Sequence, residues 1–376
     1  MSMHGIKTNI LTNGTRPITD SATAVIGLVA TSNATGEALT KLNAAFPLNT
    51  AVRFDDIRKA IAAAGPTGTL LPALEAINDQ CSPTIIVVRV GIDALGQDAL
   101  TIAGVDKLLA AESATGARPR IIGAPALDTA EVTAQLVVAA KRLRAMTYAA
   151  GVGDDIEDVV TYAGTFGDRE LMLIWPNWTG DFAGDAVARA MGLRAAIDQA
   201  QGWHKSISNV SVGGVTGISK DLFFDIQDDT TEVQALNDAN VTTLVRSPAG
   251  GFVYWGNRTT SSEPLFAFEP AVRTSQVLQD EIAAGLLWAV DKPLTNFLVK
   301  DVLETINVRF RSLTSQGRII GGKAWFDPAL NEQADLAAGK LTVDYDFTPA
   351  APLEGLTLNQ RITDTYYADL AADLAA

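Results

Sequence analysis

The sequence predicts a larger α/β domain with a mainly parallel sheet, followed by a C-terminal α+β domain of two helices on a small sheet, with an extended arm at each end. A chain of 376 residues exceeds the roughly 250–300 at which single cores stop growing. Short apolar runs alternate with helical patterns in the first two thirds, and after Pro264 the order becomes helix, helix, then strands only. We place the segments at 1–20 (N-terminal arm), 21–262, 263–361 and 362–376 (C-terminal arm).

The N-terminal stretch "HGIKTNILTNGTRPI", from His4 to Ile18, has the pattern of an extended segment. It ends in the turn-forming pair Asn13-Gly14 and in Pro17. One side of the segment carries Ile6, Thr8, Ile10 and Thr12.

The α/β domain is predicted from continuous apolar runs, which are typical of parallel strands buried on both faces. The runs are "ATAVIGLVA", "PTIIVVRV", "RPRIIGAP" and "ELMLIWPNW", and "VTTLVRSPAGGFVYWGNRT" predicts two strands around a turn. Helical spacing predicts a helix over "GDAVARAMGLRAAIDQAQG". Another is predicted from Thr129 to a stop at Gly151, with Val132, Leu136, Ala139, Leu143 and Met146 on its apolar face.

The C-terminal domain is predicted from two amphipathic helices and one alternating strand. The first helix carries Leu278, Ile282, Leu286 and Ala289, and the second, with Thr295 as its N-cap, carries Leu298, Val302, Ile306, Phe310 and Leu313. In "KLTVDYDFTP" one strand face has Leu341, Val343, Tyr345 and Phe347, which gives the helices an apolar surface to pack on.

The chain ends in "LNQRITDTYYADLAADLAA", in which Leu358, Ile362 and Tyr366 alternate with polar residues. A period of two predicts a strand, and nothing later in the sequence can cover its open edge. Such a strand needs a partner from elsewhere.

Composition excludes several classes of function. The formal charge of −14 opposes binding to nucleic acid or to anionic membranes. The single cysteine, Cys81, permits no intramolecular disulfide, which fits folding in the cytosol. The N-terminus lacks the apolar region of a signal peptide, and no apolar run reaches the roughly 18 residues of a membrane span.

Motifs for catalysis or metal binding are weak. Neither His4 nor His204 has another histidine or a cysteine at ligand spacing, and G-x-S-x-G is missing. "GRIIGGKA" matches most of a P-loop but lacks the final hydroxyl and enters a strand instead of a helix. The acidic runs at 154–158 and 225–232 lack calcium-loop spacing. We therefore expect no catalytic residue, no cofactor and no metal.

Several stretches in order resemble the contractile tail sheath proteins of myovirus-type phages and R-type tailocins, in their compact, temperate-phage version. They include "FPLNTAVRF", "GISKDLFFDIQD", "GFVYWGNRTTSSEPLFAF", "WAVDKPLTNFLVKDVLETIN", "IGGKAWFDPALN" and "GKLTVDYDFTPAAPLEGLTLNQRITDTYY". The resemblance covers nearly the whole chain.

The resemblance implies a structural subunit that stacks as hexameric rings around a tail tube and contracts irreversibly to drive the tube through a bacterial envelope. Its implied partners are further copies of itself, the tube protein, and baseplate and tail terminator proteins. It implies assembly in the host cytoplasm and a place in the virion tail sheath. Its arms, which would complete the sheets of neighbouring subunits, map onto the N-terminal residues named above and onto Ile362, Asp364, Tyr366 and Tyr367; the receiving sheet contains Leu341, Val343, Tyr345 and Phe347.

Two alternatives remain open on sequence alone. The sheath could serve a tailocin or a secretion-type injection apparatus, since every residue argument is shared. An α/β hydrolase or nucleotide-binding enzyme is suggested by the βαβ texture and "GRIIGGKA", although fold texture is weak evidence for function.

Overall fold

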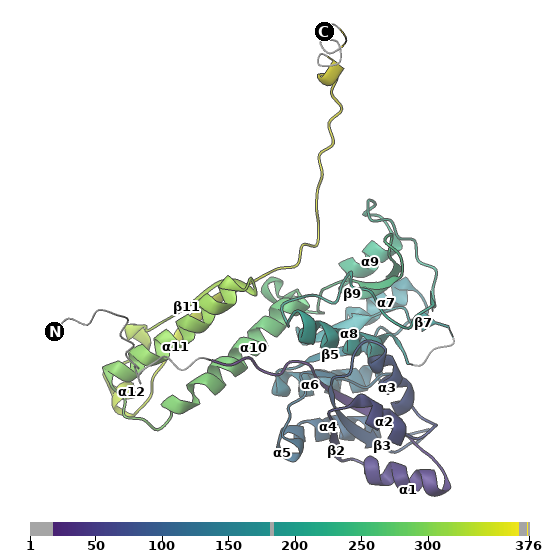
Figure 1. Cartoon of the computed structure of the whole chain (residues 1–376), viewed down its shortest axis with the longest axis horizontal. Helices are drawn as coiled ribbons and strands as arrows, with labels where there is room; N and C mark the ends of the chain where they lie inside the picture. The colour runs from purple at the N-terminus through teal and green to yellow at the C-terminus, as the bar shows by residue number, and fades with distance from the viewer. Residues whose placement is uncertain (1–17, 181–183, 368–373, 375–376) are drawn as a thin grey trace, which may run out of the picture.

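The structure is a computed structural model and describes residues 18–180, 184–367 and 374. Figure 1 shows an α/β domain, a pair of long helices that projects from it, and a C-terminal segment that extends away from both. The predicted arm residues Ile6, Thr8, Ile10 and Thr12 lie outside the described residues.

The α/β domain is built on an eight-stranded sheet in the order β10-β9-β6-β5-β4-β1-β3-β2. Its inner strands are parallel, and only the edge strands β2 and β10 pair in antiparallel fashion, so the predicted mainly parallel sheet is confirmed. The strands are β1 (Val25–Thr31), β2 (Ala51–Phe54), β3 (Thr84–Val90), β4 (Ile121–Gly123), β5 (Met146–Ala150), β6 (Leu171–Ile174), β9 (Val241–Arg246) and β10 (Phe252–Trp255). A separate short pair joins β7 (Trp178–Thr179) to β8 (Gly217–Ile218).

Helices cover both faces of this sheet. In β1, which is buried along its whole length, Ile26 and Leu28 pack against the core under α3 and α8, whereas Val25 and Val29 pack against α4 and α6. Burial on both faces explains the continuous apolar run in the sequence. The helices are α1 (Gly36–Ala45), α2 (Ile57–Ala63), α3 (Leu70–Asn78), α4 (Gln97–Leu108), α5 (Ala111–Thr115), α6 (Ala130–Leu143), α7 (Ile156–Ala163), α8 (Ala186–Ala200) and α9 (Glu232–Asp238).

The predicted helix from Thr129 to Gly151 was wrong at its end. Helix α6 stops at Leu143 because Arg144 adopts a left-handed conformation with φ of 51°. Met146 then starts β5, which fills the place between β4 and β6. Helical spacing and strand alternation coincide over these few residues, and the tertiary position decides between them.

The C-terminal domain begins with two helices, as predicted, and Figure 1 shows that they run antiparallel. Helix α10 (Glu269–Leu286) is preceded by the turn η1 (Pro264–Phe266), and α11 (Asn296–Ser315) is capped by Thr295, whose hydroxyl accepts a hydrogen bond from the backbone N–H of Leu298 at 3.3 Å. Ala289 lies outside the first helix, in the turn η2 (Leu287–Ala289).

A two-stranded antiparallel sheet packs on these helices. It pairs β11 (Ile319–Trp325) with β12 (Asp344–Pro349), and the connection contains η3 (Pro328–Leu330) and α12 (Gln333–Ala337). "GRIIGGKA" therefore leads into β11 and follows a helix, as expected for a sequence that is not a P-loop. The predicted strand was too long, because Leu341 and Val343 precede β12.

The predicted strand near the C-terminus is not formed within the chain. Residues 350–364 carry no strand pairing, and Thr365–Tyr367 form a turn that begins a helical backbone. A strand requires a partner for its backbone groups, and this segment runs away from the rest of the molecule (Figure 1).

Candidate assembly surfaces

The small sheet has one face fixed on α11. Phe310 is fully buried beneath it, with its ring centroid 5.9 Å from that of Tyr345. Val343 and Phe347 join the same core. At Gly322 a Cβ atom would lie 3.0 Å from both the Phe310 ring and the carbonyl oxygen of Asp346, so the helix and the strands approach closely there.

Two asparagine side chains bind the backbone of this sheet. Asn307 of α11 accepts a hydrogen bond from the N–H of Ala324 through Oδ1 (2.8 Å) and donates one to its carbonyl oxygen through Nδ2 (3.0 Å). Asn331 likewise accepts a hydrogen bond from the N–H of Thr342 at 2.8 Å and donates one to its carbonyl oxygen at 2.9 Å. Each amide thus replaces a neighbouring strand at one residue. Strand β12 begins at Asp344, which is paired with the last residue of β11, Trp325.

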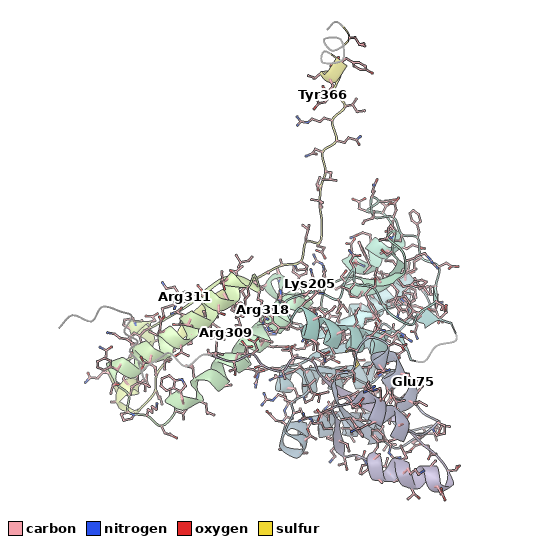
Figure 2. The ribbon with its side chains drawn as sticks, viewed as in Figure 1. Glu75, Lys205, Arg309, Arg311, Arg318 and Tyr366 are labelled. Atoms are coloured by element: carbon pink, nitrogen blue, oxygen red, sulfur yellow. The ribbon has the colours of Figure 1, made fainter. Side chains whose placement is uncertain are left out.

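The described start of the chain is tied to α10 and α11. Ile18 is 7% exposed and packs in the C-terminal core, where Gly285 leaves room for it. Asp20 forms an ion pair with Arg309 at 2.5 Å, and that hydrogen bond lowers the pKa of the Asp20 carboxyl. Arg309, which is labelled in Figure 2, also binds Glu281 at 2.6 Å.

A buried charge cluster joins α8 of the α/β domain to α10. Its members are at most 2% exposed. Arg194 binds Asp198 at 2.8 Å and Glu269 at 3.3 Å, and Arg273 binds the same two carboxylates. Tyr148 donates a hydrogen bond to Glu269 at 2.9 Å. Burial raises the pKa of Glu269, and both arginines oppose that rise. Because each charge has partners of opposite sign, the cluster fixes the two domains to each other.

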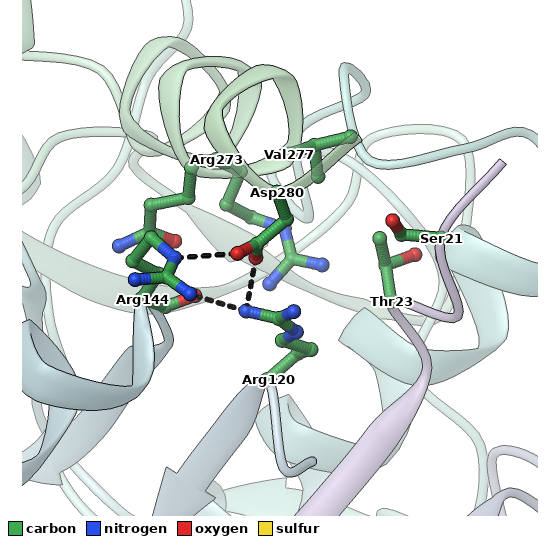
Figure 3. A pocket seen from close by; sticks show the side chains of 8 residues that line it. Ser21, Thr23, Arg120, Arg144, Arg273, Val277 and Asp280 are labelled. Carbon is green, nitrogen blue, oxygen red and sulfur yellow. Dashed lines mark hydrogen bonds and ion pairs between the residues drawn. The ribbon is translucent and has the colours of Figure 1, made fainter. Parts of the chain in front are cut away.

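A second ionic contact lies further along α10. In Figure 3 the carboxylate of Asp280 receives the guanidinium groups of Arg144 (2.5 Å) and Arg120, which stand at the end of α6 and the start of β4. The pocket drawn there has room of about 10 Å³, which is at most one water molecule. The ion pairs join the two domains at this point.

The C-terminal segment leaves the molecule at an ion pair. Glu354 binds Arg258 through two contacts, Oε1 to Nε at 2.8 Å and Oε2 to Nη2 at 2.5 Å. Beyond Glu354, the hydrogen bonds described for residues 355–367 are local to that segment. Figure 2 shows Tyr366 at its far end. Its apolar side chains are exposed: Leu356 (72%), Leu358 (81%), Ile362 (96%), Tyr366 (74%) and Tyr367 (73%).

The described residues offer little for catalysis. Within them no group of three or more His, Cys, Asp or Glu side chains could hold a metal ion, and no helix is long and apolar enough to cross a membrane. The pKa of His204 is lowered, mainly by burial and then by nearby cations including Arg318. Asp155, in one of the acidic runs, caps α7 by accepting from the N–H of Asp158 at 3.0 Å.

The structure brings together part of the predicted set. Tyr345 and Phe347 lie in β12, and Val343 packs beside them, whereas Leu341 is outside the core cluster of the described residues. Ile362, Asp364, Tyr366 and Tyr367 lie on the exposed C-terminal segment. Sequence reasoning missed Asn307, Asn331 and the Arg258–Glu354 pair. The signal available for Asn307 was a polar residue next to the apolar stripe of α11, directly after Ile306.

Family models for phage tail sheath proteins match three consecutive parts of the chain. The region called "Tail sheath protein Gp18 domain III N-terminal region" matches residues 23–90, and "Phage tail sheath protein central domain" matches 101–260. "Phage tail sheath C-terminal domain" matches 261–363.

Full-length relatives carry the same description. The tail sheath protein of Escherichia phage P2 is 44% identical over 398 aligned positions, covering 99% of this chain and 98% of that protein. The major tail sheath protein of Serratia phage KSP20 is 42% identical, with coverage of 99% and 98%.

Solved structures with the same fold come from contractile injection systems. The sheath of the extracellular contractile injection system PVC, in its contracted state, has a TM-score of 0.74 at 17% identity, covering 98% of this chain and 99% of that one. The contracted helical sheath of the anti-feeding prophage has a TM-score of 0.71 at 16% identity, with coverage of 97% and 99%.

Proposed function

The chain belongs to the contractile phage tail sheath family and is a structural sheath subunit, not an enzyme; from this premise we propose that its copies are linked by strand addition through their terminal arms. In this proposal the C-terminal segment of one subunit, including Ile362, Asp364, Tyr366 and Tyr367, pairs with the β11–β12 sheet of a neighbour. The observation that carries it is an extended, unpaired segment with exposed apolar side chains on a chain whose small sheet has strand edges to offer.

The N-terminal arm is proposed as a second strand-forming tether, through Ile6, Thr8, Ile10 and Thr12, which pairs with the strand that the C-terminal segment adds to a neighbour's sheet. Support comes from the next described residues. Ile18, Asp20 and Ser21 are bound to α10 and α11, with the Ser21 N–H donating to Glu281 at 3.1 Å. An arm that begins at such a fixed base is tied firmly to its own subunit, so a pull on it is passed to the C-terminal domain.

The energetics favour assembly on a template. About four backbone hydrogen bonds gain roughly 0.5–1.5 kcal/mol each, while ordering the strand costs about 1–2 kcal/mol per residue. The net free energy of forming one tether is therefore close to zero. Burial of apolar side chains such as Leu358 and Ile362 is needed to make it favourable. We propose that a baseplate and a tail tube supply the template and that a terminator protein ends growth.

Head-to-tail arm contacts are heterologous, so they can generate a helix. In this proposal the helix consists of stacked hexameric rings. Contraction then requires a lower-energy packing of the same rigid subunits while the tethers keep neighbours attached. The buried cluster of Arg194, Asp198, Glu269 and Arg273 supports rigid movement of the two domains together. In this proposal the subunit assembles in the host cytoplasm, and contraction drives the tube through the bacterial envelope.

A tailocin or secretion-type apparatus is the second candidate. It is favoured by the fold shared with the PVC and anti-feeding prophage sheaths, which are parts of injection systems. Genes for a capsid and a packaging terminase beside this gene would indicate a phage. Lysis genes without capsid and terminase genes would indicate a tailocin.

Deleting residues 355–376 tests the proposal. The cut falls after Glu354, so the packed domains and the Arg258 contact stay intact. We expect a folded subunit with unchanged circular dichroism that forms no cylinders in negative-stain electron microscopy under conditions in which the full chain does. Normal cylinders from the truncated chain would refute the tether.

A further inference from the structure

The two edges of the β11–β12 sheet differ in how many backbone groups they leave open. On β11 both backbone groups of Ala324 are bound by Asn307. A β-bulge interrupts the same strand between Ile319 and Gly321. Between the bulge and Ala324, Gly322 is the one residue whose backbone N–H and C=O groups stay open on that edge. One residue offers too few hydrogen-bonding groups for an added strand.

The other edge of the sheet is open. In an antiparallel ladder, residue pairs alternate. In one pair the backbone N–H and C=O groups bond to each other across the two strands, and in the next pair they face the outer edges of the sheet. The backbone N–H and C=O groups of Ala324 face away from β12 and bind Asn307. The backbone groups of its partner Tyr345 therefore face away from β11, and so do those of Phe347, which is paired with Gly322. In the described chain, neither Tyr345 nor Phe347 has a hydrogen bond outside the strand pair.

We propose that the C-terminal segment of a second copy is added only along β12, and that Asn307 is the positioning residue that closes β11 to it. This inference rests on the strand addition proposed above and adds which edge accepts the strand. It assigns a positioning role to a side chain on the edge of the sheet opposite the incoming strand.

The segment after Glu354 fits the β12 edge in length and chemistry. Residues 355–364 are extended and exceed the six residues of β12. Leu356, Leu358 and Ile362 share one side by strand alternation and are at least 72% exposed, so pairing can bury them on the helix side of the sheet. Arg361 is of opposite charge to Asp344 and Asp346 of β12.

Hydrogen–deuterium exchange on the full chain, as free subunit and as polymer, tests this edge choice. In the free subunit we expect slow exchange at the Ala324 amide and fast exchange at Tyr345 and Phe347. In the polymer, the amides of Tyr345 and Phe347 are expected to slow by about tenfold or more, whereas Gly322 stays fast. Protection gained at Gly322 and not at β12 would overturn the edge choice while leaving strand addition intact. No gain at either edge would instead refute strand addition itself.

Asn307→Ala gives a second measurement, with Asn331→Ala as the matched control. Each change removes an asparagine that binds both backbone groups of one residue, but only Asn307 lies on the β11 edge. For Asn307→Ala we expect about tenfold faster exchange at Ala324 and polymers of irregular width, as strands join at both edges. Asn331→Ala should give uniform cylinders. Uniform cylinders from Asn307→Ala, with Gly322 and Ala324 unprotected in them, would show that Asn307 does not close the edge. If Asn307→Ala fails to fold, the exchange pattern of the natural chain decides alone.

Discussion

Arg258 and Glu354 form a two-point ion pair across 96 residues, between the end of the α/β domain and the root of the C-terminal segment. The guanidinium of Arg258 also lies 5.1 Å from the ring centroid of Phe268, which orients it. Glu354 is thus the last fixed point before the exposed segment. The pair sets where that segment leaves the subunit.

Glu354→Gln should weaken the attachment of the C-terminal segment at residue 354 without unfolding the protein. Both partners are partly exposed, so we expect a loss of at most about 1 kcal/mol in unfolding free energy. Exchange of the backbone amides at 350–354 should rise, as measured by hydrogen–deuterium exchange. Glu304→Gln, which breaks the exposed pair with Arg311, is the control and should leave these amides unchanged. Equal exchange in both variants would show that the ion pair does not hold the segment.

Asp198→Asn should be strongly destabilising. It removes one of two carboxylates that neutralise Arg194 and Arg273 in a fully buried site, so a cation is left without compensation. We expect a loss of about 3–5 kcal/mol in urea unfolding. Asp55→Asn, which breaks an exposed pair with Arg53, should have a much smaller effect. Similar losses for both variants would contradict the structural role of the cluster.

Asp128 should make stability depend on pH. Burial, followed by the nearby charge of Asp185, raises its pKa in the folded protein from 3.8 to about 7. Between these values the folded state holds a proton that the unfolded state has released, so stability falls as pH rises from about 4 to 7. The largest contribution is about 4 kcal/mol. Asp128→Asn mimics the neutral acid, so its stability relative to the natural protein should increase over this range. Parallel curves in denaturation series from pH 4 to 8 would refute the assignment.

Gly285→Ala tests the contact between Ile18 and α10 at the base of the N-terminal arm. An alanine in a helix normally stabilises by up to about 1 kcal/mol, but here the new Cβ would stand 2.5 Å from Cγ1 of Ile18. We expect net destabilisation and easier proteolysis near residue 18. Ile18→Ala is itself destabilising because it truncates a buried side chain, but the double variant should lose less stability than the sum of the two single variants, because the clash disappears. Additive effects of the two changes would show that Ile18 does not occupy this site.

The sequence predicted the elements whose signals are local. The apolar runs at β1, β3 and β4, the amphipathic α10 and α11, and the Thr295 cap all follow from spacing within one element. The end of α6 at Arg144 and the start of β12 at Asp344 were missed, since each depends on distant partners: the sheet position of β5 and the end of the paired strand at Trp325. The same holds for ion pairs such as Arg258–Glu354. Periodicity carries no information about contacts of that range.

The central claim is that the C-terminal segment is a strand completed only on another molecule. Cryo-electron microscopy of the cylinders formed by the full chain tests it most directly. The account predicts density that runs from Glu354 of one subunit to the β12 edge of a neighbour, with residues between 355 and 367 paired there. Density that returns each segment to its own subunit, with no crossing between molecules, would contradict it.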